Sequence, residues 1–257
     1  MNRTTWRERR NHRALEQLSS RVTDSFPNAV WRHALASKRV PDTLTGAVGA
    51  YWQAHPLRAE RLARALAALS GPPAGWSWTL DVDRRDGLPT HFRTPPAPFR
   101  EAAFSRGRGS CCICGQPVFR YGWHSDLWCD GRPSVRATWH QACAVAWKFW
   151  TAPHLQTPVL KRVQRFRCAL TGKRLPAVSE VDHRVPLFRV WRKHRWEPWP
   201  KLLQYWGLPN LQVITREAHL AKCAAEAEDR AARLSRRRQV RSQNASRATG
   251  LVPAEEA

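Results

Sequence analysis

The residues with the clearest chemical potential stand together at positions 180–187, where the sequence reads EVDHRVPL. Asp182 offers a carboxylate and His183 an imidazole, the residue types that bind a divalent ion and take up a proton near neutral pH. The same pair is equally typical of an ordinary strand end, where an aspartate caps a turn and a histidine has local partners. Because two residues leave both interpretations open, the rest of the chain must supply the partners of a metal site.

Candidate partners follow in the segment PNLQVITREAHLAKC. Asn210 precedes an alternating apolar run, Leu211–Ile214, and Thr215 is a residue type that caps helices at their start. His219 would then project from the first turns of that helix. We therefore expect a strand, a loop, a second strand and a helix, with room for one metal ion between the hairpin and the helix.

This ordered set resembles the HNH endonucleases, which have the ββα-metal nuclease fold. The resemblance lies in D-H-x-x-P-L, then N-L-Q-V-I, then H-x-x-K, and it covers about residues 165–230. It implies that Asp182 and His219 ligate a catalytic divalent ion, Mg²⁺ or another, and that His183 is the general base. It also implies a catalytic role for Asn210, which would fix the loop or the base.

The chemistry of phosphodiester hydrolysis explains these residue types. A divalent ion stabilises the charge on the leaving oxygen, while a neutral imidazole takes the proton of the attacking water. Cys223 stands where related bacterial toxins have a further metal-binding histidine, although a thiol suits a hard divalent ion poorly.

The sequence departs from the family in a second way. Many HNH proteins carry two CxxC pairs around the hairpin. Here the first pair is reduced to CALTG, with Cys168 followed by Thr171, and Thr215 and Ala218 occupy the second pair's positions. We therefore expect no zinc ion inside this unit.

A separate group of potential ligands lies upstream, in RGSCCICGQ and ATWHQACAVAW. A CxxC turn followed by an HxxC pair at a helix start gives the four ligands of a closed tetrahedral zinc site. The ligand set that we predict is Cys111, Cys114, His140 and Cys143. The pattern is similar to LIM and treble-clef zinc modules. Buried thiols in a small core are the alternative, and Cys112 or Cys129 could replace one of the ligands.

Several elements are needed to position these residues. Residues 1–71 are predicted to form a helical N-terminal region, because leucines recur at three- and four-residue spacing before Gly71–Pro72, with a break at Pro41–Asp42. We assign the remainder to a Pro-rich connection, a zinc-binding module, an HNH nuclease domain and a disordered basic tail, at residues 72–105, 106–159, 160–232 and 233–257. The expected fold class is α+β, a ββα-metal unit with a helical N-terminal region and a small zinc-binding module.

The charge of the chain indicates its partner. Lys and Arg number 43 against 20 Asp and Glu, which gives a formal net charge of +23. Such a field favours a polyanion, first nucleic acid, with double-stranded DNA expected, and second an anionic membrane surface. The apolar runs are too short for a membrane span or a signal peptide, so we expect no membrane partner and a cytoplasmic location.

The segment 188–209 combines five Lys or Arg residues with four tryptophans. Basic residues between aromatic ones suit a groove that follows a nucleic-acid backbone. We expect the tryptophans mainly in the core and the basic residues at phosphates, although Lys222 fits an ordinary exposed helix lysine equally well. The predicted nucleic-acid-binding residues are Arg184, Arg189, Arg192, Lys193, Arg195 and Lys222.

The sequence therefore predicts a divalent-metal-dependent HNH endonuclease that hydrolyses phosphodiester bonds in DNA, with His183 as general base and a structural Zn²⁺ elsewhere. The alternative is a zinc-dependent nucleic-acid-binding protein whose HNH fold is not catalytic. A further alternative is a structural or assembly protein in which the basic surface alone binds the partner.

Overall fold

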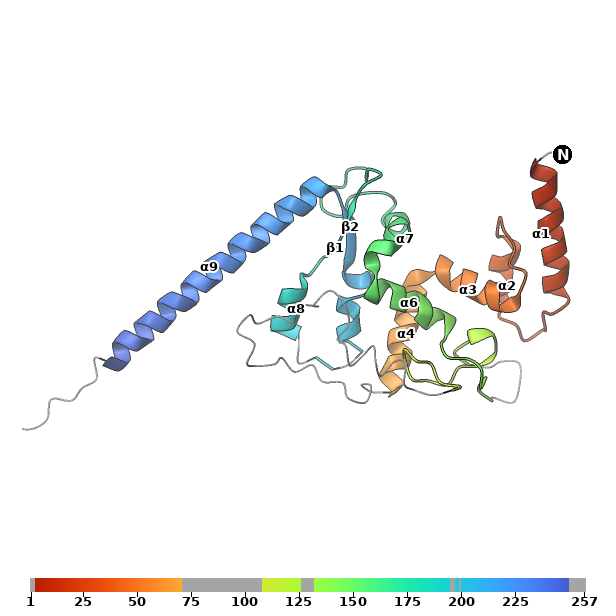
Figure 1. The fold of residues 1–257 in the computed structure, drawn as a ribbon, viewed down its shortest axis with the longest axis horizontal. Helices are drawn as coiled ribbons and strands as arrows, with labels where there is room; N and C mark the ends of the chain where they lie inside the picture. Colours follow the sequence, from red (N-terminus) through yellow and green to blue (C-terminus); the bar gives the residue numbers. More distant parts are fainter. Residues whose placement is uncertain (1–2, 71–107, 126–131, 195–196, 199, 250–257) are drawn as a thin grey trace, which may run out of the picture. The chain divides into compact units, whose positions relative to one another are not determined.

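The computed structural model describes residues 3–70, 108–125, 132–194, 197–198 and 200–249. Within these residues it contains eight α-helices, several short 3₁₀ turns and one two-stranded sheet (Figure 1). The mixed helix and strand content expected from the sequence is confirmed at this level. In the described residues, no helix combines the length and the apolar character needed to cross a membrane.

The chain divides into two compact units that interrupt each other in sequence. The first comprises Met1–Leu160 and His183–Gln212, and the second comprises Lys161–Asp182 and Val213–Ala257. Strands β1 (Glu180–His183) and β2 (Leu211–Ile214) form the sheet, and each of them runs from one unit into the other. The segment that the sequence assigns to one nuclease domain, residues 160–232, is thus shared between both units.

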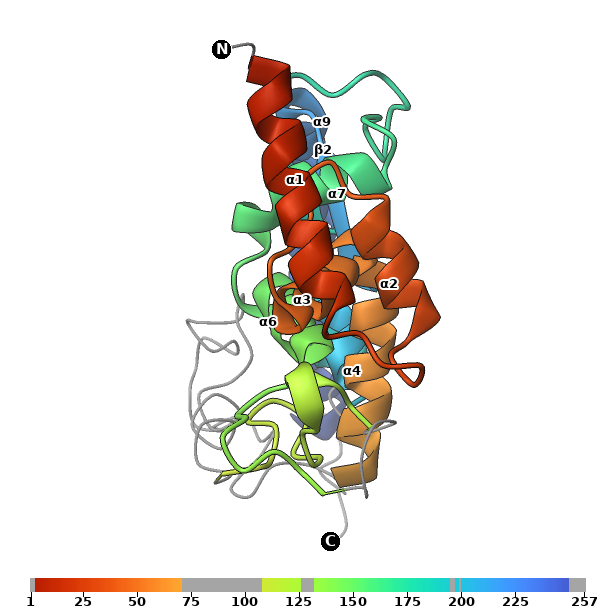
Figure 2. The ribbon, with the colours of Figure 1, turned by 90° about the vertical axis from the view of Figure 1, so that its right-hand side faces the viewer.

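The N-terminal region is helical, as predicted. Its helices are α1 (Arg3–Ser19), α2 (Asn28–Leu35), α3 (Leu44–Ala54) and α4 (Pro56–Ser70). The predicted break at Pro41–Asp42 falls between α2 and α3, where the Thr43 hydroxyl accepts a hydrogen bond from Gly46 N at 3.0 Å and caps α3. Figure 2 shows α1 and α2 side by side, and Asn11 of α1 donates to Lys38 O at 2.7 Å.

The core of the first unit joins segments that are far apart in sequence. Helix α6 (Gln141–Thr151) packs against α3 and α4, and α8 (Leu187–His194) packs against the 3₁₀ turn Leu202–Tyr205. One buried apolar cluster contains Ala63, Leu66, Ala146, Trp150, Leu187, Val190, Leu202, Leu203 and Trp206. The core position predicted for the insert's tryptophans is confirmed for Trp206, whereas the side chains of the other three lie outside the described residues.

A polar contact is buried inside this core. Glu60 of α4 is fully buried, and the Arg64 guanidinium contacts both of its carboxylate oxygens, at 3.1 and 3.3 Å. Burial raises the pKa of Glu60, while the Arg64 charge opposes that shift. Gly207 lies against this group, because a Cβ at that position would stand 2.5 Å from Glu60 Oε1 and 2.7 Å from Trp150 Nε1.

The second unit is built around β2 and a long helix. Gln164 clamps Val213 by accepting from its N–H at 2.6 Å and donating to its carbonyl at 2.9 Å. Helix α9 (Arg216–Thr249) begins where the Thr215 hydroxyl accepts from Ala218 N at 3.2 Å, which confirms the predicted N-cap. Residues 233–249, expected as a disordered tail, belong to this helix, since they are rich in residues with high helix propensity. The remaining helix, α7, spans Thr157–Val163.

The close approach at Gly207 generates a stability prediction. Gly207→Ala is expected to lower the free energy of unfolding by about 1–3 kcal/mol, because the added methyl must displace buried polar atoms. Gly49→Ala is the matched control. Its Cβ meets nothing closer than 3.4 Å, and alanine favours the helix α3 by up to about 1 kcal/mol. Thermal unfolding of both variants measures the difference, and a Gly207→Ala protein as stable as wild type would contradict the packing described.

Candidate metal centre and the predicted active-site residues

The four predicted zinc ligands are brought together in the first unit. Cys111 and Cys114 lie on a tight turn, His140 directly precedes α6, and Cys143 lies in the first turn of that helix. All four residues are buried, and their ligand atoms lie within 4.8 Å of one another. Among the described residues, this is the one group of three or more such side chains that could hold a metal ion.

The turn that carries two of the thiols is fixed by backbone hydrogen bonds. Cys111 N donates to Gln116 O, and Gly115 N donates to Cys111 O, both at 2.8 Å. Gly115 has a φ of +77°, a conformation that a residue with a Cβ rarely adopts. The Cys111 sulfur also accepts from Ile113 N at 3.4 Å. The turn therefore directs both sulfurs to the side where His140 and Cys143 lie.

The imidazole of His140 is oriented for coordination. Its Nε2 lies 2.9 Å from Pro117 O, so Nε2 carries the proton and donates it to that carbonyl. Its Nδ1 lies 3.4 Å from the Cys114 sulfur and 3.7 Å from the Cys143 sulfur. The lone pair of Nδ1 thus faces the two thiols, as a metal ligand requires.

The electrostatics of the cluster favour a bound cation. Hydrogen bonds from the thiols of Cys114 and Cys143 lower the pKa of Cys111 strongly. The neighbouring Cys111 sulfur raises the pKa of Cys114 to about 12, and burial raises the pKa of Cys143 well above its usual value. The Cys111 sulfur and burial thus both oppose further ionisation, and a divalent ion would offset them and allow all three sulfurs to be thiolates.

Of the two cysteines considered as replacements, Cys112 is not part of the cluster. Burial raises the pKa of Cys112 to about 11, and its backbone N–H is bonded to Thr138 O at 2.8 Å. Cys129 lies outside the described residues. A set of three sulfurs and one nitrogen fills a tetrahedral shell and leaves no position for substrate, so the chemistry available to this centre is structural.

Metal content tests this cluster. The purified chain is expected to hold about one tightly bound metal ion, and Cys143→Ser is expected to lose it together with much of the thermal stability of the first unit. Elemental analysis gives both the amount and the element. Cys112→Ser is the matched control and should retain the ion, and a Cys143→Ser protein with unchanged metal content would refute the ligand set.

Asp182 is held by a cation from the same chain. Its Oδ2 accepts from Lys222 Nζ at 2.6 Å, and the same ammonium group lies 2.9 Å from Glu226 Oε1. Burial favours the neutral amine, but the bonds to Asp182 and Glu226 outweigh it and raise the pKa of Lys222. Lys222, predicted to contact phosphate, is thus engaged by two carboxylates, with 16 % of its side chain exposed.

His219 lies on α9, three residues before Lys222. Its Nε2 is 3.6 Å from the sulfur of Cys223, one helical turn later. Cys223 is exposed, and His219 is partly exposed. Asp182, His219 and Cys223 are not among the groups of potential ligands that the described structure gathers around one point.

His183 ends β1 and precedes a loop that Asn210 holds. The amide oxygen of Asn210 accepts from Val185 N at 2.7 Å, and its amide nitrogen donates to Val185 O and Tyr205 O, both at 2.9 Å. The backbone adds a bond from Arg184 N to Asn210 O at 2.7 Å. Asn210 is buried, so this side chain fixes the backbone that directly follows His183.

The bonds of Asn210 can be tested by a near-isosteric change. Asn210→Asp is expected to lower the free energy of unfolding by about 2–3 kcal/mol, because a carboxylate at this buried position cannot donate to the carbonyls of Val185 and Tyr205. Chemical denaturation measures the loss. Asn244→Asp, an exposed change on α9, is the control and should stay within about 0.5 kcal/mol of wild type. Equal stability of the two variants would contradict the bonding described.

The other predicted nucleic-acid contacts lie around α8. Leu187 and Val190 of this helix are buried, whereas Arg192 and Lys193 are exposed on its outer side. Arg184 is exposed in the loop before it, and the guanidinium of Arg189 lies 5.9 Å from the Phe188 ring centroid. Arg195 lies outside the described residues.

The turn Cys168–Gly172, in which the second cysteine of a CxxC pair is replaced by Thr171, has the same backbone geometry as the turn Cys111–Gly115. Cys168 N donates to Lys173 O at 2.7 Å, Gly172 N donates to Cys168 O at 2.9 Å, and Gly172 has a φ of +69°. Burial opposes ionisation of Cys168, but hydrogen bonds from the Thr171 side chain and from nearby backbone groups lower its pKa to about 7. The repeated turn was not recognised from the sequence, although the shared C-x-x-x-G spacing signals it.

Comparison with known proteins gives no relative: no family model, curated protein or solved structure matches this chain.

Proposed function

We propose that this chain is a divalent-metal-dependent endonuclease of the HNH type that hydrolyses phosphodiester bonds in DNA. The observation that carries the proposal is the side chain of Asn210, which forms two hydrogen bonds with Val185 in the loop after His183 and a third with Tyr205 O. A fixed loop at this point limits the freedom of a general base. The net charge of +23 supports a polyanionic substrate.

The roles of the side chains follow from their chemistry. The imidazole of His183 takes the proton of the attacking water, and Asp182 and His219 hold the divalent ion, for which Mg²⁺ is the first candidate. Once bound, that ion supplies Lewis-acid stabilisation of the leaving oxygen. Exposed Arg184, Arg192 and Lys193 contact backbone phosphates and position the strand.

The carboxylate of Asp182 fits a cation. The ammonium group of Lys222 lies 2.6 Å from Asp182 Oδ2, so a positively charged group already occupies the place next to this carboxylate. A divalent ion bound at Asp182 takes the place of that ammonium group, which keeps Glu226 as a partner on the same helix. Lys222 is then a competitor of the metal rather than a phosphate ligand.

We also propose that the Cys111–Cys114–His140–Cys143 cluster holds Zn²⁺ in a structural role. A site made of three thiolates and an imidazole binds Zn²⁺ in preference to Mg²⁺. The cluster lies within the buried core shared by α4, α6 and the segment 187–206, so the ion would stabilise that core directly.

Plasmid nicking tests the catalytic proposal. With Mg²⁺ or Mn²⁺ present, His183→Ala is expected to lower the cleavage rate at least about 100-fold, the usual contribution of a general base. His154→Ala, which removes an exposed histidine elsewhere, is the control and should cleave at the wild-type rate. Equal cleavage by wild type and His183→Ala would sink the assignment of the base.

The second candidate function is DNA binding without cleavage, and the Asp182–Lys222–Glu226 ion pairs favour it, because they neutralise the carboxylate that a catalytic metal needs. Lys222→Met separates the two. For a nuclease, this variant should reach half-maximal cleavage at a lower Mg²⁺ concentration than wild type. A chain that binds DNA but cuts it in neither form is a binding protein.

A further inference from the structure

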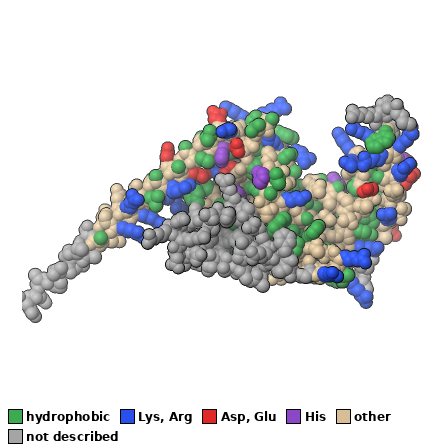
Figure 3. Space-filling view, viewed as in Figure 1, with side chains coloured by type: hydrophobic (Ala, Val, Ile, Leu, Met, Phe, Trp, Pro, Cys, Tyr) green, Lys and Arg blue, Asp and Glu red, His purple; other side chains and the backbone are tan. Residues whose placement is uncertain are grey.

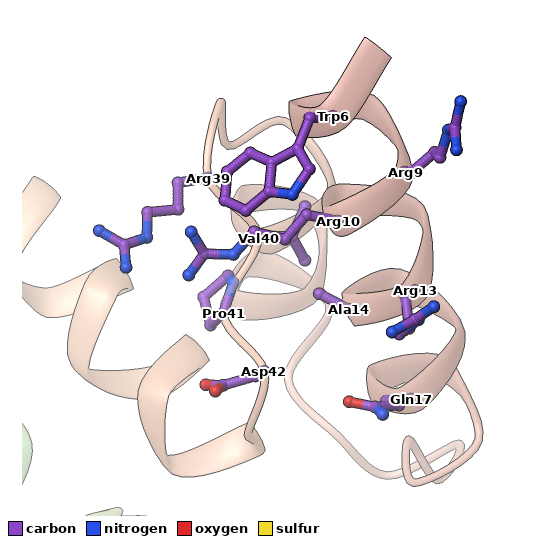
Figure 4. Close-up of a pocket in the computed structure, with 10 residues that line it drawn as sticks. All are labelled: Trp6, Arg9, Arg10, Arg13, Ala14, Gln17, Arg39, Val40, Pro41 and Asp42. Atoms are coloured by element: carbon purple, nitrogen blue, oxygen red, sulfur yellow. The ribbon is translucent and has the colours of Figure 1, made fainter. Parts of the chain in front are cut away.

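The first unit contains an open groove between α1 and the segment that precedes α3. Its volume is about 550 Å³, within the range of about 300–1,000 Å³ that is usual for ligand sites. Trp6, Arg10 and Arg13 line it from α1, and Arg39 and Asp42 line it from the other side (Figure 4). In Figure 4 the side chain of Arg10 lies beneath the Trp6 ring, at the centre of the groove.

The groove carries positive charge that the chain does not neutralise. Its lining includes one aspartate and four arginines, a net charge of +3, the fourth arginine being Arg9. In the described part of the chain, Arg10, Arg13 and Arg39 take part in no ion pair. Figure 3 shows Lys and Arg side chains gathered over α1. An excess of positive charge around one groove favours an anion with several charges.

Trp6 adds a feature that a plain anion site does not need. Its side chain is 59 % exposed, and the Arg10 guanidinium lies 5.6 Å from the ring centroid. An exposed indole next to arginines is the arrangement on which unpaired bases stack in single-stranded nucleic-acid sites. A continuous duplex offers phosphates to such a groove, but it keeps its base faces covered.

An anionic membrane is a poorer match. Trp6 is the only large apolar side chain exposed on the described side chains of α1, and a helix that lies in a bilayer interface needs a continuous apolar face. Several arginines beside one exposed aromatic ring instead match the chemistry of a phosphate backbone with an unpaired base.

We propose that this groove binds an unpaired stretch of nucleic acid, with Arg10, Arg13 and Arg39 at phosphates and one base stacked on Trp6. The groove is distinct from the residues assigned to cleavage, and its binding does not depend on a catalytic metal. In a nuclease it would hold a single-stranded segment, and in a non-cleaving protein it would be a primary contact.

Fluorescence anisotropy with a labelled 20-nucleotide single strand, as DNA and as RNA and without added divalent ion, tests the proposal. Arg10→Ala/Arg39→Ala should weaken binding about 25-fold at 0.1 M salt and reduce the log–log salt slope by about 1.4, as loss of two phosphate contacts requires. The matched control is Arg7→Ala/Arg21→Ala, which removes the same charge from exposed positions outside the groove lining. The control should change the affinity less than about threefold, as expected for exposed charges that make no direct contact.

Two further variants separate stacking from charge. Trp6→Ala should weaken single-strand binding about 5- to 150-fold, with a smaller effect on the duplex, whereas Trp6→Phe should restore most of it. Asp42→Asn should tighten binding about threefold, a gain that damage to the fold cannot produce.

Three results would overturn the proposal: equal losses in both double-arginine variants, Trp6→Phe behaving like Trp6→Ala, or Trp6→Ala weakening binding only to phosphatidylserine vesicles. Cleavage is not measured in these titrations. A result that contradicts single-strand binding in the groove can therefore be distinguished from a result that contradicts the nuclease assignment.

Discussion

The first unit contains three buried sulfurs and one imidazole whose ligand atoms lie within 4.8 Å of one another. Three thiols this close together can ionise at the same time only when a cation offsets their charge. Without a cation, the Cys111 sulfur raises the pKa of Cys114 and burial raises the pKa of Cys143, so that thiol contacts alone join the cluster. A bound metal turns the same atoms into four strong bonds that join a turn to a helix. Ser70, the last residue of α4, is joined to the same turn because its hydroxyl donates to Cys114 O at 2.5 Å.

A continuous series of packing contacts and hydrogen bonds in the first unit connects the Cys/His cluster to the loop after His183. Cys143 and Trp150 lie on the same helix, and Trp150 lies against Gly207, which leaves no room for a Cβ. Gly207 O accepts from Asn210 N at 3.0 Å, and the Asn210 side chain holds Val185. The candidate metal cluster and the loop after His183 are therefore parts of one packed body, although their residues are separated in sequence.

The features that could be predicted from the sequence are those that neighbouring residues determine, such as tight turns and the starts of helices. The CxxC and HxxC spacings locate four ligands because a tight turn and a helix start each fix two residues locally, and Thr215 reveals its helix by its residue type. Contacts between residues far apart in the sequence could not be predicted in this way. Nothing in the pattern around Lys222 shows that it would pair with Asp182, and the Trp6 groove depends on how α1 meets residues 39–42. The helix at 233–249 was missed because its many charges suggested solvation rather than helix propensity.

The turn at Cys168–Gly172 gives the molecule an internal comparison. It has the hydrogen bonds and the positive φ of the Cys111–Gly115 turn but lacks the partner thiol, and hydrogen bonds rather than a metal stabilise its sulfur. Backbone hydrogen bonds and a glycine are therefore sufficient to form this turn, with or without a second thiol. If the first cluster holds zinc as proposed, a shortage of zinc would remove the bonds that join the Cys111–Cys114 turn to α6, while the Cys168–Gly172 turn of the second unit would keep its hydrogen bonds. Zinc supply would then govern one part of the protein and leave the other unaffected.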